Sequence, residues 1–230
     1  MSEVASTSSV LAGEARAGGC EPCVLVADHQ TAGRGRLDRR WDDSPGGLMV
    51  SIRVPVAVKE AAAIGIRLAA AARSALQDSL PHPVLVKWPN DLVIEAGPAP
   101  GKLAGILSEL VDGAEPVVVA GLGCNLEPVP TQPGATSMRQ CGAGEELDRD
   151  PLLSEVLRAF AGPFADQSVA LAEVRTRSAT LGRLVRVTLP GGRVIEGVAT
   201  AIDDRGRLVV AGPGGAESVT AGDVVSVRRG

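Results

Sequence analysis

The sequence predicts an α+β fold, in which a mixed β-sheet flanked by helices is followed by a small C-terminal β-barrel. Two observations support this prediction. Short runs rich in valine and leucine alternate with an alanine-rich helical segment over the first 180 residues. From about Leu181 the chain changes to short β-runs that glycine-containing turns separate. We therefore predict one domain at residues 1–180 and a small β-barrel domain at residues 181–230.

The first half of the chain contains two apolar runs and one long helical segment. Cys23–Asp28 and Gly46–Val54 are dominated by apolar residues and predict strands. Val58–Leu80 carries apolar residues at helical spacing, and Pro81 follows it directly. Because proline cannot continue a helix, we predict a helix that ends at Leu80.

The rest of the first domain is predicted from turn signals and apolar runs. The residue before Pro89 is held in extended geometry, which favours a strand ending at Trp88. Asp150 and Pro151 fit the cap and the first position of a helix that runs to Leu171. Between this strand and this helix we predict a hairpin at 92–111, a buried strand at 115–126 and a long loop at 127–143.

Composition limits the classes of function. The formal net charge is −4, which disfavours a general nucleic-acid-binding surface. Runs of about 18 apolar residues and a signal peptide are both missing from the sequence, so we expect a cytoplasmic protein without a membrane segment. Cys20 and Cys23 have the spacing of a metal or redox pair, but no second such pair exists. Small, partly buried cysteines are therefore the favoured interpretation, and we assign no metal ligands.

The stretch DHQTAGRGRLDRRW holds four arginines within seven residues of this acidic protein. We call Gly33–Trp41 the arginine loop. Its glycines let backbone amides approach an anion, and its arginines supply charged donors. The spacing matches neither a P-loop nor the GxGxxG fingerprint. Taken alone, the segment is better explained as a solvated basic loop.

Three further motifs lie at ends of predicted strands: KWPND at 87–91, GKLAGILSE at 101–109 and GLGCN at 121–125. Each also has a plain structural interpretation, as a strand-ending turn, a hairpin or a tight turn. Together with the arginine loop they supply cations and amides, without an evident Ser–His–Asp arrangement. Such groups suit phosphoryl or adenylyl transfer, in which catalysis rests on positioning and on neutralising charge.

These four motifs, in this order, resemble those of the biotin protein ligases. The resemblance implies a class II synthetase-like catalytic domain and a small C-terminal β-domain. It implies ATP-dependent transfer of biotin, through biotinyl-5′-AMP, to a lysine of a biotin carboxyl carrier domain, with Mg²⁺ entering with ATP. Because the chain begins close to its Ser–Thr motif, we expect a form without a DNA-binding domain. DNA and membranes are not expected as partners, whereas a homodimer is possible.

The resemblance also implies roles for individual residues. Arg36 and Lys102 are the expected catalytic residues, Arg36 by retaining the reactive intermediate. The expected biotin-binding residues are Ser6, Thr7, Ser8, Gln30, Gly33, Arg34, Gly35, Arg36, Lys102 and Gly105. The expected ATP-binding residues are Arg34, Arg36, Trp41, Lys87, Asn90, Asp91, Lys102 and Asn125.

The chain departs from the family pattern at two places besides its short start. Ser8 stands where asparagine is usual, and Leu37-Asp38 replaces a basic or polar residue and a glycine after GRGR. Two other functions therefore stay open at this point. One is a lipoate-type ligase of the same fold, and the other is a non-catalytic protein that binds biotin or biotinyl adenylate.

Overall fold

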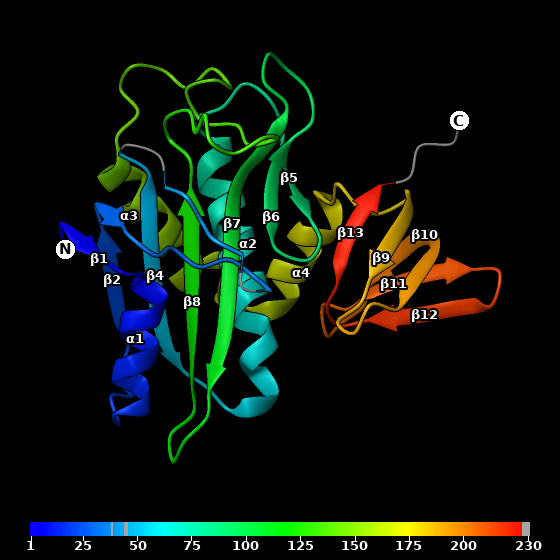
Figure 1. Ribbon diagram of the computed structural model, residues 1–230, viewed down its shortest axis with the longest axis horizontal. Helices are drawn as coiled ribbons and strands as arrows, with labels where there is room; N and C mark the ends of the chain where they lie inside the picture. Colours follow the sequence, from blue (N-terminus) through cyan, green and yellow to red (C-terminus); the bar gives the residue numbers. More distant parts are fainter. Residues whose placement is uncertain (38, 44–45, 227–230) are drawn as a thin grey trace.

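A six-stranded antiparallel sheet forms the centre of the larger domain (Figure 1). The structure is a computed structural model that describes residues 1–37, 39–43 and 46–226. Across the sheet the strands are β2 (Cys23–Ala27), β4 (Leu48–Pro55), β8 (Val117–Cys124), β7 (Gly101–Val111), β6 (Asp91–Ile94) and β5 (Val84–Lys87). The predicted strands are confirmed, but the predicted mixed sheet is wrong, because every pairing within this sheet is antiparallel. Parallel strand pairing occurs between two-residue strands, β1 (Glu3–Val4) and β3 (His29–Gln30).

Alternating residues of β8 serve the two faces of the sheet. Val117 and Val119 pack against Leu11 of helix α1 (Thr7–Arg16) on one face. The residues that alternate with them along the strand, such as Ala120 and Leu122, join the main core on the other face. Because side chains alternate along a strand, this one segment separates a small core under α1 from a large core under α2.

Four helices cover the two faces of the sheet. The sequence did not predict α1, whose N-cap Ser6 accepts a hydrogen bond from the backbone N–H of Ser9. Helix α2 (Ala61–Gln77) lies on the opposite face and is preceded by a 3₁₀ turn at Val58–Glu60. Helices α3 (Arg149–Ala161) and α4 (Gln167–Thr176) pack against the outer side of α2. Among the described residues, no helix is both long and apolar enough to cross a membrane.

The predicted helix Pro151–Leu171 is two helices. They are α3 (Arg149–Ala161) and α4 (Gln167–Thr176), with a 3₁₀ turn at Pro163–Ala165 between them. Gly162 and Pro163 interrupt the helical pattern, because proline removes a backbone donor and glycine tolerates the break. The predicted cap Asp150 is also wrong, since Asp148 caps α3 by accepting from the N–H of Asp150.

The C-terminal part is a five-stranded antiparallel sheet. Across it the strands are β12 (Gly215–Val219), β11 (Leu208–Gly212), β10 (Val194–Ile202), β9 (Leu184–Thr188) and β13 (Asp223–Ser226). Within the described residues its edge strands β12 and β13 are not paired with each other, so closure into a barrel is not confirmed. The division at residues 180 and 181 likewise stays a prediction.

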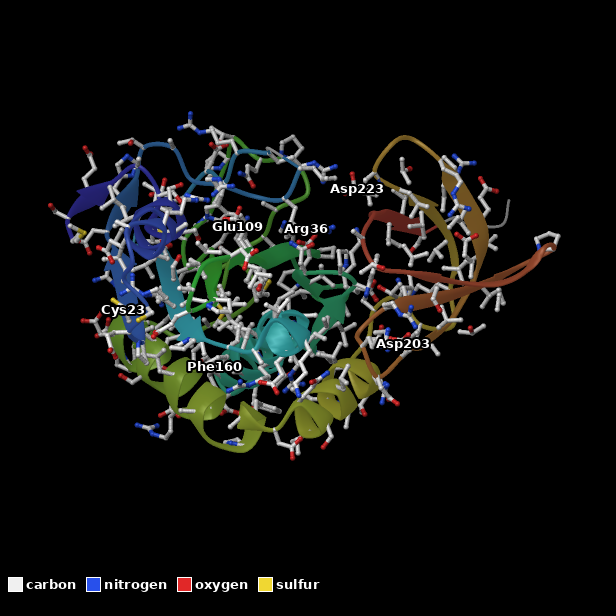
Figure 2. The ribbon with its side chains drawn as sticks, turned by 90° about the horizontal axis from the view of Figure 1, so that it is seen from below. Cys23, Arg36, Glu109, Phe160, Asp203 and Asp223 are labelled. Atoms are coloured by element: carbon white, nitrogen blue, oxygen red, sulfur yellow. The ribbon has the colours of Figure 1, made fainter. Side chains whose placement is uncertain are left out.

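Trp88 fastens the C-terminal sheet to the larger domain. Its backbone N–H donates to Thr180 Oγ1 at 3.0 Å, and its indole Nε1 donates to the Gly206 carbonyl at 3.0 Å. The Trp88–Pro89 peptide bond is cis. Close by, Gly206 lies against Ile66 of α2, where a Cβ would approach Cδ1 to 2.3 Å. Figure 2 shows the two sheets side by side, with Arg36 and Asp223 at their junction.

Replacing Trp88 by phenylalanine should destabilise the protein by about 2 kcal/mol. The change removes the donor to Gly206 and part of a side chain that is 5% exposed. A lower midpoint of urea unfolding, followed by the fluorescence of Trp41, would measure the loss. Val169→Ala is the control, because Val169 is 45% exposed and should change stability little. An equal midpoint for Trp88→Phe and the control would contradict this account.

Candidate functional site

A cavity of about 530 Å³ lies between the α1 face of the central sheet, the arginine loop and β13. The loop crosses in front of β8 and β7 (Figure 1), and its Arg39 forms an ion pair with Asp223 of β13. The structure brings most of the predicted site residues to this cavity. Those that line it are Ser6, Thr7, Ser8, Gln30, Arg34, Gly35, Arg36, Trp41, Lys87, Asn90, Asp91, Lys102 and Gly105.

Two glycines on neighbouring strands form the floor of the cavity. Gly105 of β7 lies directly opposite Gly123 of β8 in the sheet register. The Trp41 ring rests on both, since a Cβ at Gly123 would approach its ring at 2.5 Å and a Cβ at Gly105 at 3.1 Å. Trp41 is 8% exposed, and its Nε1 has no hydrogen-bond partner among the described residues. The arginine loop is thus anchored through Trp41 to a strip of sheet without side chains.

A buried network of hydroxyl and amide groups forms one end of the cavity. Thr7 Oγ1 and Ser8 Oγ lie 2.8 and 2.9 Å from Ser51 Oγ on β4. Gln30 Oε1 accepts from the Thr7 backbone N–H at 2.8 Å. Gly121 leaves room for this network, because a Cβ there would lie 2.6 Å from Ser8 Oγ. These groups give the site neutral donors and acceptors that are already oriented.

Sequence reasoning missed Ser51 and Gly121 as parts of this end. Ser51 is fully buried in the middle of β4, where a serine among apolar residues was the available signal. Gly121 belongs to the GLGCN motif, but only its register opposite Ser51 and Leu107 shows which face of the sheet it serves.

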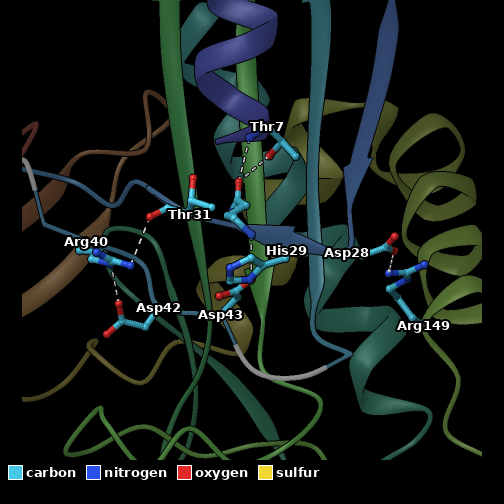
Figure 3. Close-up of polar contacts among 9 residues, drawn as sticks. Thr7, Asp28, His29, Thr31, Arg40, Asp42, Asp43 and Arg149 are labelled. Carbon is cyan, nitrogen blue, oxygen red and sulfur yellow. Dashed lines mark hydrogen bonds and ion pairs between the residues drawn. The ribbon is translucent and has the colours of Figure 1, made fainter. Parts of the chain in front are cut away.

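Asp43 holds the segment that carries Gln30. Its Oδ2 accepts from the Gln30 backbone N–H at 2.9 Å and contacts His29 Nδ1 at 2.8 Å. Figure 3 shows this pair beside the Arg40–Asp42 ion pair and the contact of Arg40 with the Thr31 carbonyl. His29 is thus engaged with Asp43 outside the polar network, and it does not line the cavity.

The described part of the arginine loop has the pairing of a short hairpin. The Trp41 N–H donates to the Gly33 carbonyl at 2.9 Å, and the Gly35 N–H donates to the Arg39 carbonyl at 2.7 Å. Leu37 lies near the turn with φ at +55°, a left-handed conformation that costs a non-glycine residue about 1 kcal/mol. Asp38, the other departure from the family pattern, lies outside the described residues.

Cationic side chains outnumber carboxylates in the lining of the cavity, and several of these cations are already paired with carboxylates. Lys102 Nζ lies 2.7 Å from Asp91 Oδ1, although the angle is poor for a hydrogen bond. Arg34 forms a two-pronged pair with Glu109 at 2.8 and 2.9 Å. These side chains are partly exposed, so each pair is worth at most about 1 kcal/mol and can yield to a stronger anion.

Arg36 differs from the other cations of the loop. Its Nη1 donates to Asn90 Oδ1 at 3.2 Å and more distantly to the Gly222 carbonyl at 3.4 Å. Burial lowers the pKa of Arg36, while the charges of Asp223 and Asp91 act in the opposite direction. A guanidinium held by neutral acceptors in a partly dehydrated position is well prepared to bind an anionic ligand.

The KWPND motif divides between the cavity and the fold. Asn90 is fixed by its Nδ2, which donates to the Ile106 carbonyl at 2.9 Å, and by the Ile106 N–H, which donates to its backbone carbonyl. Lys87 lies opposite Asp91 in the β5–β6 pair, and both line the cavity. Trp88 also lines the cavity, while its hydrogen bonds to Thr180 and Gly206 connect the central sheet with the C-terminal sheet.

Two predicted site residues do not line the cavity. Asn125 is 2% exposed, and its Nδ2 donates to the Thr136 carbonyl at 3.0 Å, so it fixes the chain after β8. Gly33 lies against Trp41, where a Cβ would meet the Trp41 carbonyl at 2.4 Å. Both positions support the walls of the cavity from behind. The neighbouring wall is instead formed by Thr131, Gln132 and Pro133, which lie in the predicted long loop.

The arrangement suits a ligand with a neutral polar end and an anionic end. The buried hydroxyls and Gln30 lie at one end, and the cations of the loop, Lys87 and Lys102 lie at the other. Among the described residues, no group of three or more histidine, cysteine or acidic side chains has a metal-binding arrangement. The cations that line the cavity suit chemistry in which two anions are brought together.

Comparisons with known proteins agree with this geometry. The family model "Biotin/lipoate A/B protein ligase family" matches residues 6–125, and "Biotin protein ligase C terminal domain" matches residues 180–226. The biotin–[acetyl-CoA-carboxylase] ligase of Mycobacterium tuberculosis is 38% identical, over 99% of this chain and 88% of its own. A protein of the same name from Paracoccus denitrificans is 31% identical over 87% of this chain and 88% of its own.

The fold matches as well. The solved structure of the biotin protein ligase from Aquifex aeolicus in complex with biotin and ATP has a TM-score of 0.77 and 25% identity. The match covers 100% of this chain and 97% of that one. The motifs in the cavity wall, the two matched family models and the full-length relatives lead to one conclusion: the chain belongs to the biotin protein ligases of the biotin/lipoate A/B protein ligase family.

Proposed function

We propose that this protein joins biotin to a lysine of a biotin carboxyl carrier domain at the expense of ATP. Biotin carboxylate attacks the α-phosphorus of ATP and releases pyrophosphate, which leaves biotinyl-5′-AMP. The ε-amine of the carrier lysine then attacks the acyl carbon and releases AMP. The observation that carries the proposal is a cavity whose lining combines a buried polar network with several cations.

The polar end of the cavity fits the uncharged ring system of biotin. Thr7, Ser8 and Gln30 offer hydroxyl and amide groups, and Ser51 and Gly121 hold them in place. Ser8 replaces an asparagine of the family pattern, yet it supplies a hydroxyl to the same network. A hydroxyl both donates and accepts, so the substitution retains polar contact with a ureido group.

The cations address the first chemical step. A carboxylate and a phosphate must approach each other, and at about 4 Å with an effective dielectric near 20 two like charges repel by roughly 4 kcal/mol. Lys102, at the start of β7, and Arg36, on the loop, both line the cavity and would offset this repulsion. Both would serve as catalytic residues by stabilising charge on the α-phosphate. Arg34, Lys87, Asn90 and Asp91 would bind the phosphates and ribose.

Trp41 and the arginine loop would cover the adenylate. The loop would order over the bound intermediate and keep water from the acyl phosphate bond. Mg²⁺ would enter with ATP as part of that substrate. Asp91 and Asp223 are the carboxylates that line the cavity, so phosphate and water oxygens would supply most of its ligands.

The same proposal includes a biotin carboxyl carrier domain as the partner, a cytoplasmic location and a homodimer. It includes neither DNA nor a membrane as a partner. The relatives from M. tuberculosis and P. denitrificans are both named as biotin–[acetyl-CoA-carboxylase] ligases, which favours biotin over lipoate. A non-catalytic binder is less favoured, because Lys102 and Arg36 retain their cationic groups in the cavity.

Mass measurement of a carrier domain after incubation with ATP, magnesium and either biotin or lipoate tests the proposal. No mass increase with biotin, from folded protein that binds biotin, would refute it.

Lys102→Ala should reduce adenylate formation by about 100-fold or more, because a fixed cation at the reacting phosphate is lost. Biotin-dependent release of pyrophosphate measures this step without a carrier. Lys59→Ala is the matched control, since Lys59 is an exposed lysine outside the cavity. Equal rates for the two variants would remove Lys102 from the chemistry.

Arg36→Gly should release the intermediate and spread biotin onto lysines of bystander proteins. The change removes the half-buried guanidinium and its contact with Asn90, so the covered state of the loop is weakened. Mass spectrometry of a mixture of carrier domain and serum albumin would identify the labelled lysines. Arg158→Gln serves as the control on an exposed helix face. Labelling that stays confined to the carrier lysine would show that the role given to Arg36 is wrong.

Gly123→Ala should weaken biotin binding roughly tenfold, because the new methyl group would displace the Trp41 ring. Isothermal titration calorimetry measures the affinity. Gly113→Ala is a matched control, since a Cβ at Gly113 meets nothing within 4 Å. Unchanged affinity in Gly123→Ala would mean that the floor does not depend on the missing side chain.

A further inference from the structure

The C-terminal sheet reaches the arginine loop through two consecutive residues, Gly222 and Asp223. The Gly222 carbonyl accepts from Arg36 Nη1, and the Asp223 carboxylate forms an ion pair with Arg39. Asp223 begins β13 and lies opposite Thr188 of β9 in an edge pair of that sheet. The loop is therefore fastened at its other end, away from Trp41, by a different sheet.

The position of Asp223 is fixed from behind by the C-terminal core. Val224, the next residue, is 6% exposed and belongs to the main core. Gly222 lies so close to Val187 that a Cβ would approach its Cγ1 to 2.8 Å. The carboxylate of Asp223 thus projects from a rigid strand end, and it lines the cavity together with Val224 and Val225.

The charges around Asp223 explain its effect on the loop. It pairs with Arg39, and its charge also opposes the lowering of the Arg36 pKa that burial causes. Without Asp223, the charge of Arg39 would still disfavour the charged form of Arg36, and Asp91 would remain as a carboxylate that opposes this effect. Repulsion between the two arginines would favour an open loop.

We propose that Asp223 is a positioning residue that holds the arginine loop over the cavity, so that the C-terminal sheet helps to retain the adenylate. The position of the loop is a property of the protein without ligands. The retention of the adenylate rests on the proposed ligase function. The contact is made through exposed Arg39 and partly exposed Asp223, so its removal should shift loop opening a few-fold and leave the fold intact.

Hydrogen exchange of the full-length protein without ligands tests the position of the loop. In Asp223→Asn, amides of peptides covering 33–41 should exchange roughly threefold faster. Asp223→Glu retains the carboxylate and should restore most of the protection. Glu217→Gln is the matched control, because it breaks an ion pair with Arg193 at the far edge of the same sheet. Equal exchange of these peptides in Asp223→Asn and wild type would overturn the proposal.

Retention of the intermediate is tested with the same variants. With biotin, ATP and magnesium, Asp223→Asn should transfer about threefold more biotin to serum albumin per carrier labelled, and Asp223→Glu and Glu217→Gln should not. Faster exchange without extra albumin labelling, in protein that biotinylates its carrier, would overturn the retention role. If wild type never labels the carrier, the ligase function fails, while hydrogen exchange still decides whether Asp223 holds the loop.

Discussion

The site depends on one constraint, the absence of side chains where Gly105 of β7 lies opposite Gly123 of β8. Any larger residue at Gly123 would collide with the Trp41 ring, and any at Gly121 would collide with Ser8. The same strand carries Val117 and Val119 further along, where they pack under α1. One face of β8 therefore changes along its length from a packed surface to an open floor, and the cavity begins at that change.

The second feature of the site is that each of its main cations has a partner in the protein. Lys102, Arg34 and Arg39 each have a carboxylate from another segment, and Arg36 has neutral acceptors. These partners keep the cations apart while the protein is empty. Because the pairs are largely exposed, they stabilise the fold little and compete weakly with phosphate. An acidic protein can in this way maintain a local site for anions.

Local patterns predicted the strands well, and they failed where long-range contacts decide. The single helix at Pro151–Leu171 was wrong because Gly162-Pro163 divides it, a signal that the apolar spacing concealed. Helix α1 was missed because its apolar side is short and packs against residues distant in the sequence, such as Val111 of β7 and Val117 and Val119 of β8. In the candidate site, most of the motif residues meet at one cavity, whereas Asn125 turns to Thr136 in the wall behind it.

The sequence by itself determined the strand runs, the arginine loop and the order of the four motifs, because these depend on neighbouring residues and turn chemistry. Only the tertiary structure decided which side chains share a face. Register places Gly105 opposite Gly123 and Ser51 opposite Gly121, and a shift by one residue would turn each to the other side of the sheet. The contact of Asp223 with Arg39 joins residues 184 positions apart, a pairing that only the packing of the two sheets creates.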